Sequence, residues 1–149
     1  MASDQLLEQY KLYVELADRV SDRRIKTNQY FITLLSGLLV VLSFVLHKDQ
    51  QATLSRYQPY IVFSVGLLGI ILCLVWQLNI SSYRQLNSQK FQVIHDMEKH
   101  LPYPLFAKEW QLLGEGKDRK KYLQLSRVEK LVPVILSLPF VVLFIYALF

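Results

Sequence analysis

Three long apolar windows dominate the chain, at residues 30–46, 60–80 and 131–149. They hold 17, 21 and 19 residues, and none of them contains Asp, Glu, Lys, Arg or His. A helix needs roughly 20 apolar residues to cross a bilayer, with a lower limit of about 17. A soluble domain of 149 residues has no interior that could bury three such helices on all sides. The pattern therefore predicts three transmembrane helices and excludes an ordinary soluble enzyme, a disordered chain and a disulfide scaffold.

The segment before the first window has the pattern of an amphipathic helix. Its apolar residues recur at spacings of three and four, which places them on one helical face. These residues are Leu6, Tyr10, Tyr13, Ala17 and Val20. No Gly or Pro separates them from the first window, so we expect one continuous helix from about Asp4 to Leu46. Such a helix is about 60 Å long, roughly twice the hydrocarbon thickness, so half of it must lie outside the bilayer.

The second window is extended in the same way. After Gly69 there is no Gly or Pro until Pro102, which predicts a helix from about Pro59 to His100. Beyond the window its apolar residues keep a helical phase, although Lys90 interrupts them. They are Tyr83, Leu86, Ile94, Met97 and Leu101. Two long antiparallel helices with apolar stripes should pack against each other as a stalk.

The remaining elements are short. Prolines in Leu101–Pro104 should end the second helix, and a short helix over Leu105–Leu113, a turn at Gly114–Gly116 and a helix over Lys117–Leu131 should follow. Pro139 should kink the third span. We therefore expect an all-α integral membrane protein with three transmembrane helices, two of which extend into a cytoplasmic helical stalk. The expected segments are an amphipathic helix at 1–29, spans at 30–46, 60–80 and 131–149, an external loop at 47–59 and a cytoplasmic region at 81–130.

The basic residues predict the orientation. Lys and Arg number five in residues 1–29, two in 47–59 and ten in 81–130. The positive-inside rule then places the N-terminus and residues 81–130 in the cytoplasm, and the 47–59 loop and the C-terminus outside. The same rule explains the sequence pI of about 9.3 without a nucleic-acid partner. Cys73 is the only cysteine, so no intrachain disulfide can form.

Two stretches resemble a known family. Residues 13–24 read YVELADRVSDRR and residues 97–110 read MEKHLPYPLFAKEW. Both are similar to the RipA-family octameric membrane proteins of bacteria, and the likeness covers nearly the whole chain. It implies a homo-oligomer of the bacterial inner membrane, with the number eight resting on the resemblance alone, and it implies no reaction, cofactor or catalytic residue. The N-terminal part is also similar to the SLATT-type effectors of bacterial conflict systems, from which the third span and the Pro-Tyr-Pro segment depart.

The first span carries a mildly polar stripe. Its members follow helical spacing along one face: Gln29, Thr33, Ser36, Val40 and Ser43. Small and hydroxylated residues let membrane helices approach and form hydrogen bonds, so one interpretation is helix packing. The other is the lining of a polar path at the centre of a ring of subunits. In the second span, Gly66, Gly69 and Cys73 form a small-residue face that favours helix packing.

Charged clusters lie beside the spans. Arg19, Arg23 and Arg24 precede the first span, with Asp18 and Asp22 among them. They indicate an orientation signal on a solvated face, Arg–carboxylate contacts between subunits, or contacts with anionic lipid. A second basic cluster near the third span has the same interpretations: Lys117, Arg119, Lys120 and Lys121.

Four residues near the end of the second helix have the side chains of metal ligands: His95, Asp96, Glu98 and His100. Their spacing does not match an HExxH motif, so we interpret them as a solvated helix end. No phosphate loop, nucleophile elbow or carboxylate pair in an apolar pocket is visible, and we expect no cofactor, no metal and no enzymatic activity. The sequence favours a scaffolding or envelope-adaptation oligomer. A channel or pore, such as a conflict-system effector, and an intramembrane enzyme remain the alternatives.

Overall fold

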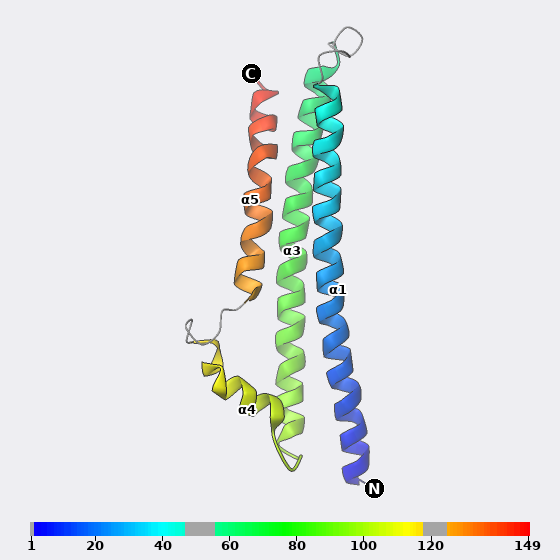
Figure 1. Cartoon of the computed structure of the whole chain (residues 1–149), viewed down its shortest axis with the longest axis vertical. Coiled ribbons are helices and arrows are strands. Elements are labelled where there is room, and N and C mark those ends of the chain that lie inside the picture. Colours follow the sequence, from blue (N-terminus) through cyan, green and yellow to red (C-terminus); the bar gives the residue numbers. More distant parts are fainter. Residues whose placement is uncertain (1, 47–55, 118–124) are drawn as a thin grey trace. The chain divides into compact units, whose positions relative to one another are not determined.

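The computed structural model describes residues 2–46, 56–117 and 125–149. These residues form four α-helices, α1 (Ala2–Val45), α3 (Gln58–Glu98), α4 (Leu105–Leu112) and α5 (Leu125–Tyr146) (Figure 1). A short 3-10 helix, η2 (Gly114–Gly116), follows α4. No β-strand occurs in this described part of the chain. The all-α architecture expected from the sequence is thereby confirmed.

The helix ends agree with the expected ones to within about two residues for α1 and α3. Both helices run without interruption because neither contains an internal proline after its first turn. The expected helix over Lys117–Leu131 is described only from Leu125, since residues 118–124 lie outside the described chain, as does most of the 47–59 loop. The helix α5 continues through Pro133 and Pro139.

The chain divides into two compact units, each of which contains part of α1 and part of α3. Unit 1 comprises Met1–Ile25 and Ile80–Val128, and therefore includes α4 and η2. Unit 2 comprises Lys26–Asn79 and Glu129–Phe149, and therefore includes most of α5.

The core of unit 1 lies between α1, α3 and α4. Tyr10 and Ala17 of α1 are buried against Ile94 of α3. Half-buried apolar side chains complete the cluster: Tyr13, Val14, Phe91, Met97, Leu101 and Phe106. Lys90 fits the apolar stripe because its Nζ lies 4.7 Å from the centre of the Tyr13 ring, a cation–π contact. Leu86 departs from the expected stripe, since it is exposed.

The core of unit 2 is made by aromatic residues. Phe31 of α1 stacks on Trp76 of α3, with ring centres 5.7 Å apart. The Trp76 Nε1–H donates a hydrogen bond to Asn28 Oδ1 over 2.8 Å. Phe140 of α5 is also buried. The single polar group of Trp76 is thus satisfied inside an otherwise apolar core.

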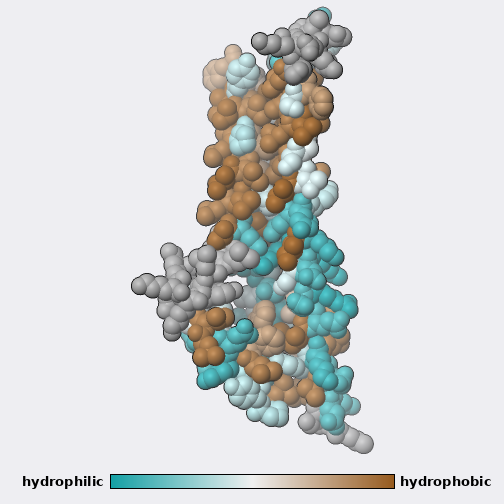
Figure 2. All heavy atoms as spheres, in the orientation of Figure 1, coloured by the Kyte–Doolittle hydropathy of each residue, from teal (hydrophilic) through white to brown (hydrophobic). Residues whose placement is uncertain are grey.

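Three of the helices are long and apolar enough to cross a membrane. No more than 33% of the most apolar window in any of them is buried within the chain. Figure 2 shows the resulting hydrophobic surface, coloured brown, on the face that it draws. A surface this apolar requires lipid or other protein chains as its surroundings.

Candidate functional site

The polar stripe of α1 faces away from the other helices of unit 2. Gln29, Thr33, Ser36 and Ser43 are all exposed, whereas the buried residues of this part of α1 lie on another face. The Thr33 hydroxyl donates to the Gln29 carbonyl over 2.9 Å, and the Ser43 hydroxyl donates to the Val40 carbonyl over 2.7 Å. Among the described residues the stripe is therefore not part of the core, and the hydroxyl protons of Thr33 and Ser43 are used within their own helix.

Gly37 lies on the same face of α1, one helical turn after Thr33, and the sequence analysis did not single it out. A Cβ atom built on Gly37 would meet nothing within 4 Å. Glycine destabilises a helix by roughly 0.5–1 kcal/mol relative to alanine. No contact within the described chain explains its presence here. The signal that could have identified it was the Thr33–Gly37 spacing, a small residue repeated after four positions.

The two glycines of α3 are in the opposite situation. A Cβ on Gly66 would lie 2.9 Å from the backbone nitrogen of Phe144, and a Cβ on Gly69 would overlap the Phe140 ring. Cys73 is buried on the same side of the helix. These residues lie where α5 packs closely against α3, so their small size is needed within one chain.

The basic residues that the structure describes do not form one cluster. Arg19 pairs with Glu15 over 2.8 Å on the exposed surface of α1, Arg23 is exposed, and Arg24 is half-buried. Lys117 Nζ lies 2.6 Å from Glu115 Oε2, and this contact raises the pKa of the Lys117 ammonium and lowers that of the Glu115 carboxyl. Arg119, Lys120 and Lys121 lie outside the described residues.

Glu98 is the most unexpected residue of unit 1. Its carboxylate is 1% exposed, at the last position of α3. It accepts a hydrogen bond from the Tyr10 hydroxyl over 2.9 Å, and bonds from the backbone N–H groups of Phe106 and Ala107 over 2.7 and 2.9 Å. These two N–H groups belong to the first turn of α4, which Pro104 precedes without a side-chain cap. Glu98 therefore caps α4 from another helix, and its negative charge suits the positive end of that helix.

The expectation of a solvated helix end is wrong for Glu98. The Glu98 carboxylate is removed from water, and the backbone N–H groups at the start of α4 supply the hydrogen bonds that water would otherwise give. Its neighbour Asp96 does remain exposed and pairs with Lys99 over 2.6 Å, which lowers the pKa of the Asp96 carboxyl. Among the residues that the structure describes, no group of three His, Cys, Asp or Glu side chains could hold a metal ion.

The surroundings of Tyr10 raise the pKa of its hydroxyl. Burial, the hydrogen bond to Glu98 and the negative charge of that carboxylate raise the pKa of the Tyr10 hydroxyl from 10.0 to about 12. All three effects favour the neutral hydroxyl. The Tyr10–Glu98 hydrogen bond therefore persists well into alkaline solution.

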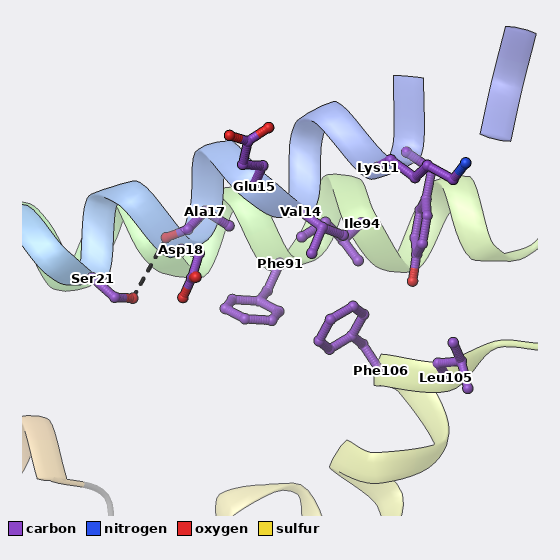
Figure 3. Close-up of a pocket in the computed structure, with 11 residues that line it drawn as sticks. Lys11, Val14, Glu15, Ala17, Asp18, Ser21, Phe91, Ile94, Leu105 and Phe106 are labelled. Carbon is purple, nitrogen blue, oxygen red and sulfur yellow. Dashed lines mark hydrogen bonds between the residues drawn. The ribbon is translucent and has the colours of Figure 1, made fainter. Parts of the chain in front are cut away.

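A groove opens beside this capping contact. It has a volume of about 490 Å³ and lies between α1, α3 and α4 of unit 1. Figure 3 shows the rings of Phe91 and Phe106 facing this space. Asp18 and Ser21 of α1 point toward the same side (Figure 3), and Glu15 is also among the residues that line the groove.

The sequence matches the octameric membrane protein family (8xMP) over residues 7–149. The chain belongs to this family. The resemblance noted from the sequence is thereby confirmed, and membership together with the three apolar helices identifies an integral membrane protein of the octameric membrane protein family. No curated protein and no solved structure matches the chain.

Proposed function

We propose that the chain forms a homo-octameric scaffold in the bacterial inner membrane, with α1 in the contact between neighbouring subunits. The family description supports eight copies. A scaffolding or envelope-adaptation role fits a chain whose distinctive exposed surfaces are suited to contacts with other chains and with lipid.

Gly37 carries this proposal. The three glycines in the helices are used differently: Gly66 and Gly69 make room for α5, whereas the space beside Gly37 is open. Small residues are enriched where membrane helices meet, because they let two backbones approach closely. A helix from a neighbouring subunit, packed along Thr33 and Gly37, would use this space.

The outward side of α5 provides the contrast. It is dominated by large apolar residues, among them Val134, Leu138 and Val142, each of which is more than half exposed. Lipid tails suit such a surface, since its large side chains offer no close approach to a neighbouring helix. We therefore assign α5 to the lipid and α1 to the subunit contact.

The proposed orientation places the N-terminus in the cytoplasm and the C-terminus outside, as the distribution of basic residues predicts. The cytoplasmic side then carries the cluster from Lys117 to Lys121. Each such residue near an anionic leaflet contributes about 1 kcal/mol of attraction. Anionic lipid is accordingly the second partner that we propose.

A pore lined by the same stripe is the competing function, and exposure of the stripe is the observation in its favour. A pore-lining hydroxyl must serve the permeating solute, but those of Thr33 and Ser43 donate to their own helix. Hydroxyls that donate to their own helix in this way leave no unpaired proton facing a neighbouring helix or lipid.

Substitution of Gly37 tests the proposal. The Gly37→Leu variant should lose the octamer in native mass spectrometry from mild detergent, because a leucine fills the space needed by the neighbouring helix. The control is Val142→Phe, which also enlarges a side chain, on the outward face of α5, and should leave eight copies. An intact octamer in Gly37→Leu, or disruption by Val142→Phe alone, would overturn the assignment of α1 to the contact. Solute flux into liposomes that is lost in Thr33→Leu would favour the pore instead.

A further inference from the structure

We propose that α4 of one subunit docks into the unit 1 groove of the next subunit around the ring. This inference rests on the octameric assembly proposed above. It adds a second contact, made by other residues than the α1 stripe, and it commits to a second copy of this chain as the occupant of the groove.

The floor of the groove is an incompletely covered apolar core. Ala17 and Ile94 are buried beneath it, whereas Val14, Phe91 and Phe106 are only half-buried and leave part of their surface facing the space. A volume of about 490 Å³ is of the size in which proteins hold a ligand or a few inserted side chains. An apolar helix face laid into such a groove is a common mode of recognition, with anchors spaced along one side of the helix.

The outward side of α4 has the form of such an inserted face. Leu112 is 70% exposed, and Lys108, four residues before it on the same side of the helix, is also exposed. Leu105, at the start of α4, lines the groove of its own chain. No residue of α4 is fully buried within its own chain. A ring of identical subunits is built from two different surfaces that fit each other, and unit 1 offers both a hollow and a projecting helix.

The charges of the two surfaces are complementary. Asp18 points to the groove side of α1 (Figure 3), and within the described residues it has no hydrogen-bond or salt-bridge partner. Lys108 likewise has no side-chain partner in the described part of the chain. Glu109 lies beside Lys108, and Lys11 stands at the other end of the groove rim in a solvent-exposed pair with Glu8. An inserted α4 can therefore bring Lys108 to Asp18 and Glu109 to Lys11.

Disulfide formation between subunits tests this docking. Cys73→Ala removes the native thiol, and two tagged chains, one with Asp18→Cys and one with Leu112→Cys, are produced together in the same membranes. Oxidation should link the two differently tagged chains, whereas chains of one kind should link to each other at least about fivefold less, because docking brings position 18 of one subunit near position 112 of the next. Eight copies by native mass spectrometry without the mixed dimer would overturn the docking and leave the proposed octamer standing. Loss of the octamer in native wild-type protein would overturn both.

Charge reversal provides the second measurement. Asp18→Lys or Lys108→Asp alone should raise about tenfold the protein concentration at which the octamer dissociates, and the two together should restore it. Asp22→Lys is the matched control, since Asp22 is an exposed carboxylate one turn after Asp18 that does not line the groove, and it should have little effect. Single reversals with no effect would overturn the docking. Dissociation that follows Asp18→Lys but is not restored by Lys108→Asp would assign the groove to another occupant, such as a lipid or a small amphiphile, and would also overturn it.

Discussion

The two units of this chain are stabilised in different ways although they share α1 and α3. In unit 2, close packing dominates: α5 fits against Gly66 and Gly69, and the buried Trp76 indole donates to Asn28. In unit 1, a buried carboxylate organises the structure, because Glu98 binds Tyr10 and the first turn of α4. Lipid supplies no hydrogen bonds, so unit 2 would gain most from shape if it spans the membrane as the sequence predicts, whereas unit 1 could use an ionised group if it lies outside the lipid.

Removal of the Glu98 carboxylate should give the largest effect. Glu98→Ala leaves the N–H groups of Phe106 and Ala107 and the Tyr10 hydroxyl without their acceptor, each at a cost of about 1–3 kcal/mol. The free energy of unfolding of unit 1 should fall by about 3 kcal/mol or more. Hydrogen–deuterium exchange should show faster exchange over residues 105–112 and no change over residues 60–76. The control is Asp96→Ala, an exposed carboxylate on the same turn, and equal effects of the two substitutions would contradict the capping role.

A methyl group at Gly69 should give the second largest effect, this time in unit 2. Gly69→Ala forces the Phe140 ring to move within a packed core, at a cost of about 1–3 kcal/mol. Thermal unfolding in detergent measures the loss. Addition of Phe140→Leu should recover part of the stability, because the smaller side chain vacates the space of the added methyl group. Additive losses in the double variant would show that the two residues do not share this contact.

The polar contact in unit 2 should matter less. Asn28→Ala removes the acceptor of the Trp76 indole and should cost about 1 kcal/mol. Asn79→Ala is the matched control, since the Asn79 side chain donates only to the Val75 carbonyl of its own helix. Urea unfolding of both variants in the same detergent compares them. A larger loss for Asn79→Ala would mean that the Asn28–Trp76 bond does not contribute.

Alkaline pH acts on unit 1 through a single hydroxyl group, that of Tyr10. The pKa of Tyr10 is raised from 10.0 to about 12 in the folded chain, so folding favours the protonated hydroxyl. The corresponding stabilisation is complete below about pH 10 and is lost as the pH rises through about 12. Tyr10→Phe should weaken this dependence in denaturation curves recorded between these pH values. An identical pH dependence in the variant and the wild type would exclude Tyr10 as its source.

The periodicity of the sequence predicted the helices well because the features that determine a helix lie close together along the chain. The apolar windows and the absence of Gly and Pro between about residue 4 and residue 36 set the course of α1, and the Pro-Tyr-Pro segment separates α3 from α4. The stripe through Tyr10 and Ala17 was visible in the spacing alone. The family was likewise accessible from sequence, since its two signature stretches lie in order along one chain.

The role of Glu98 could not be predicted in this way. Its partners are 88 residues away at Tyr10 and on the next helix at Phe106 and Ala107, so no spacing within α3 reveals them. Gly37 was missed for a related reason. Its proposed role follows from the open space beside it. That space stands out only by comparison with the filled spaces beside Gly66 and Gly69.

Cryo-electron microscopy of the protein in lipid nanodiscs tests the central claim most directly. The account predicts a ring of eight copies in which a helix of the neighbouring subunit contacts Gly37 and Thr33, while acyl chains cover the outward face of α5. Acyl chains lying against Gly37, with the neighbouring subunit packed on Val142 instead, would contradict it.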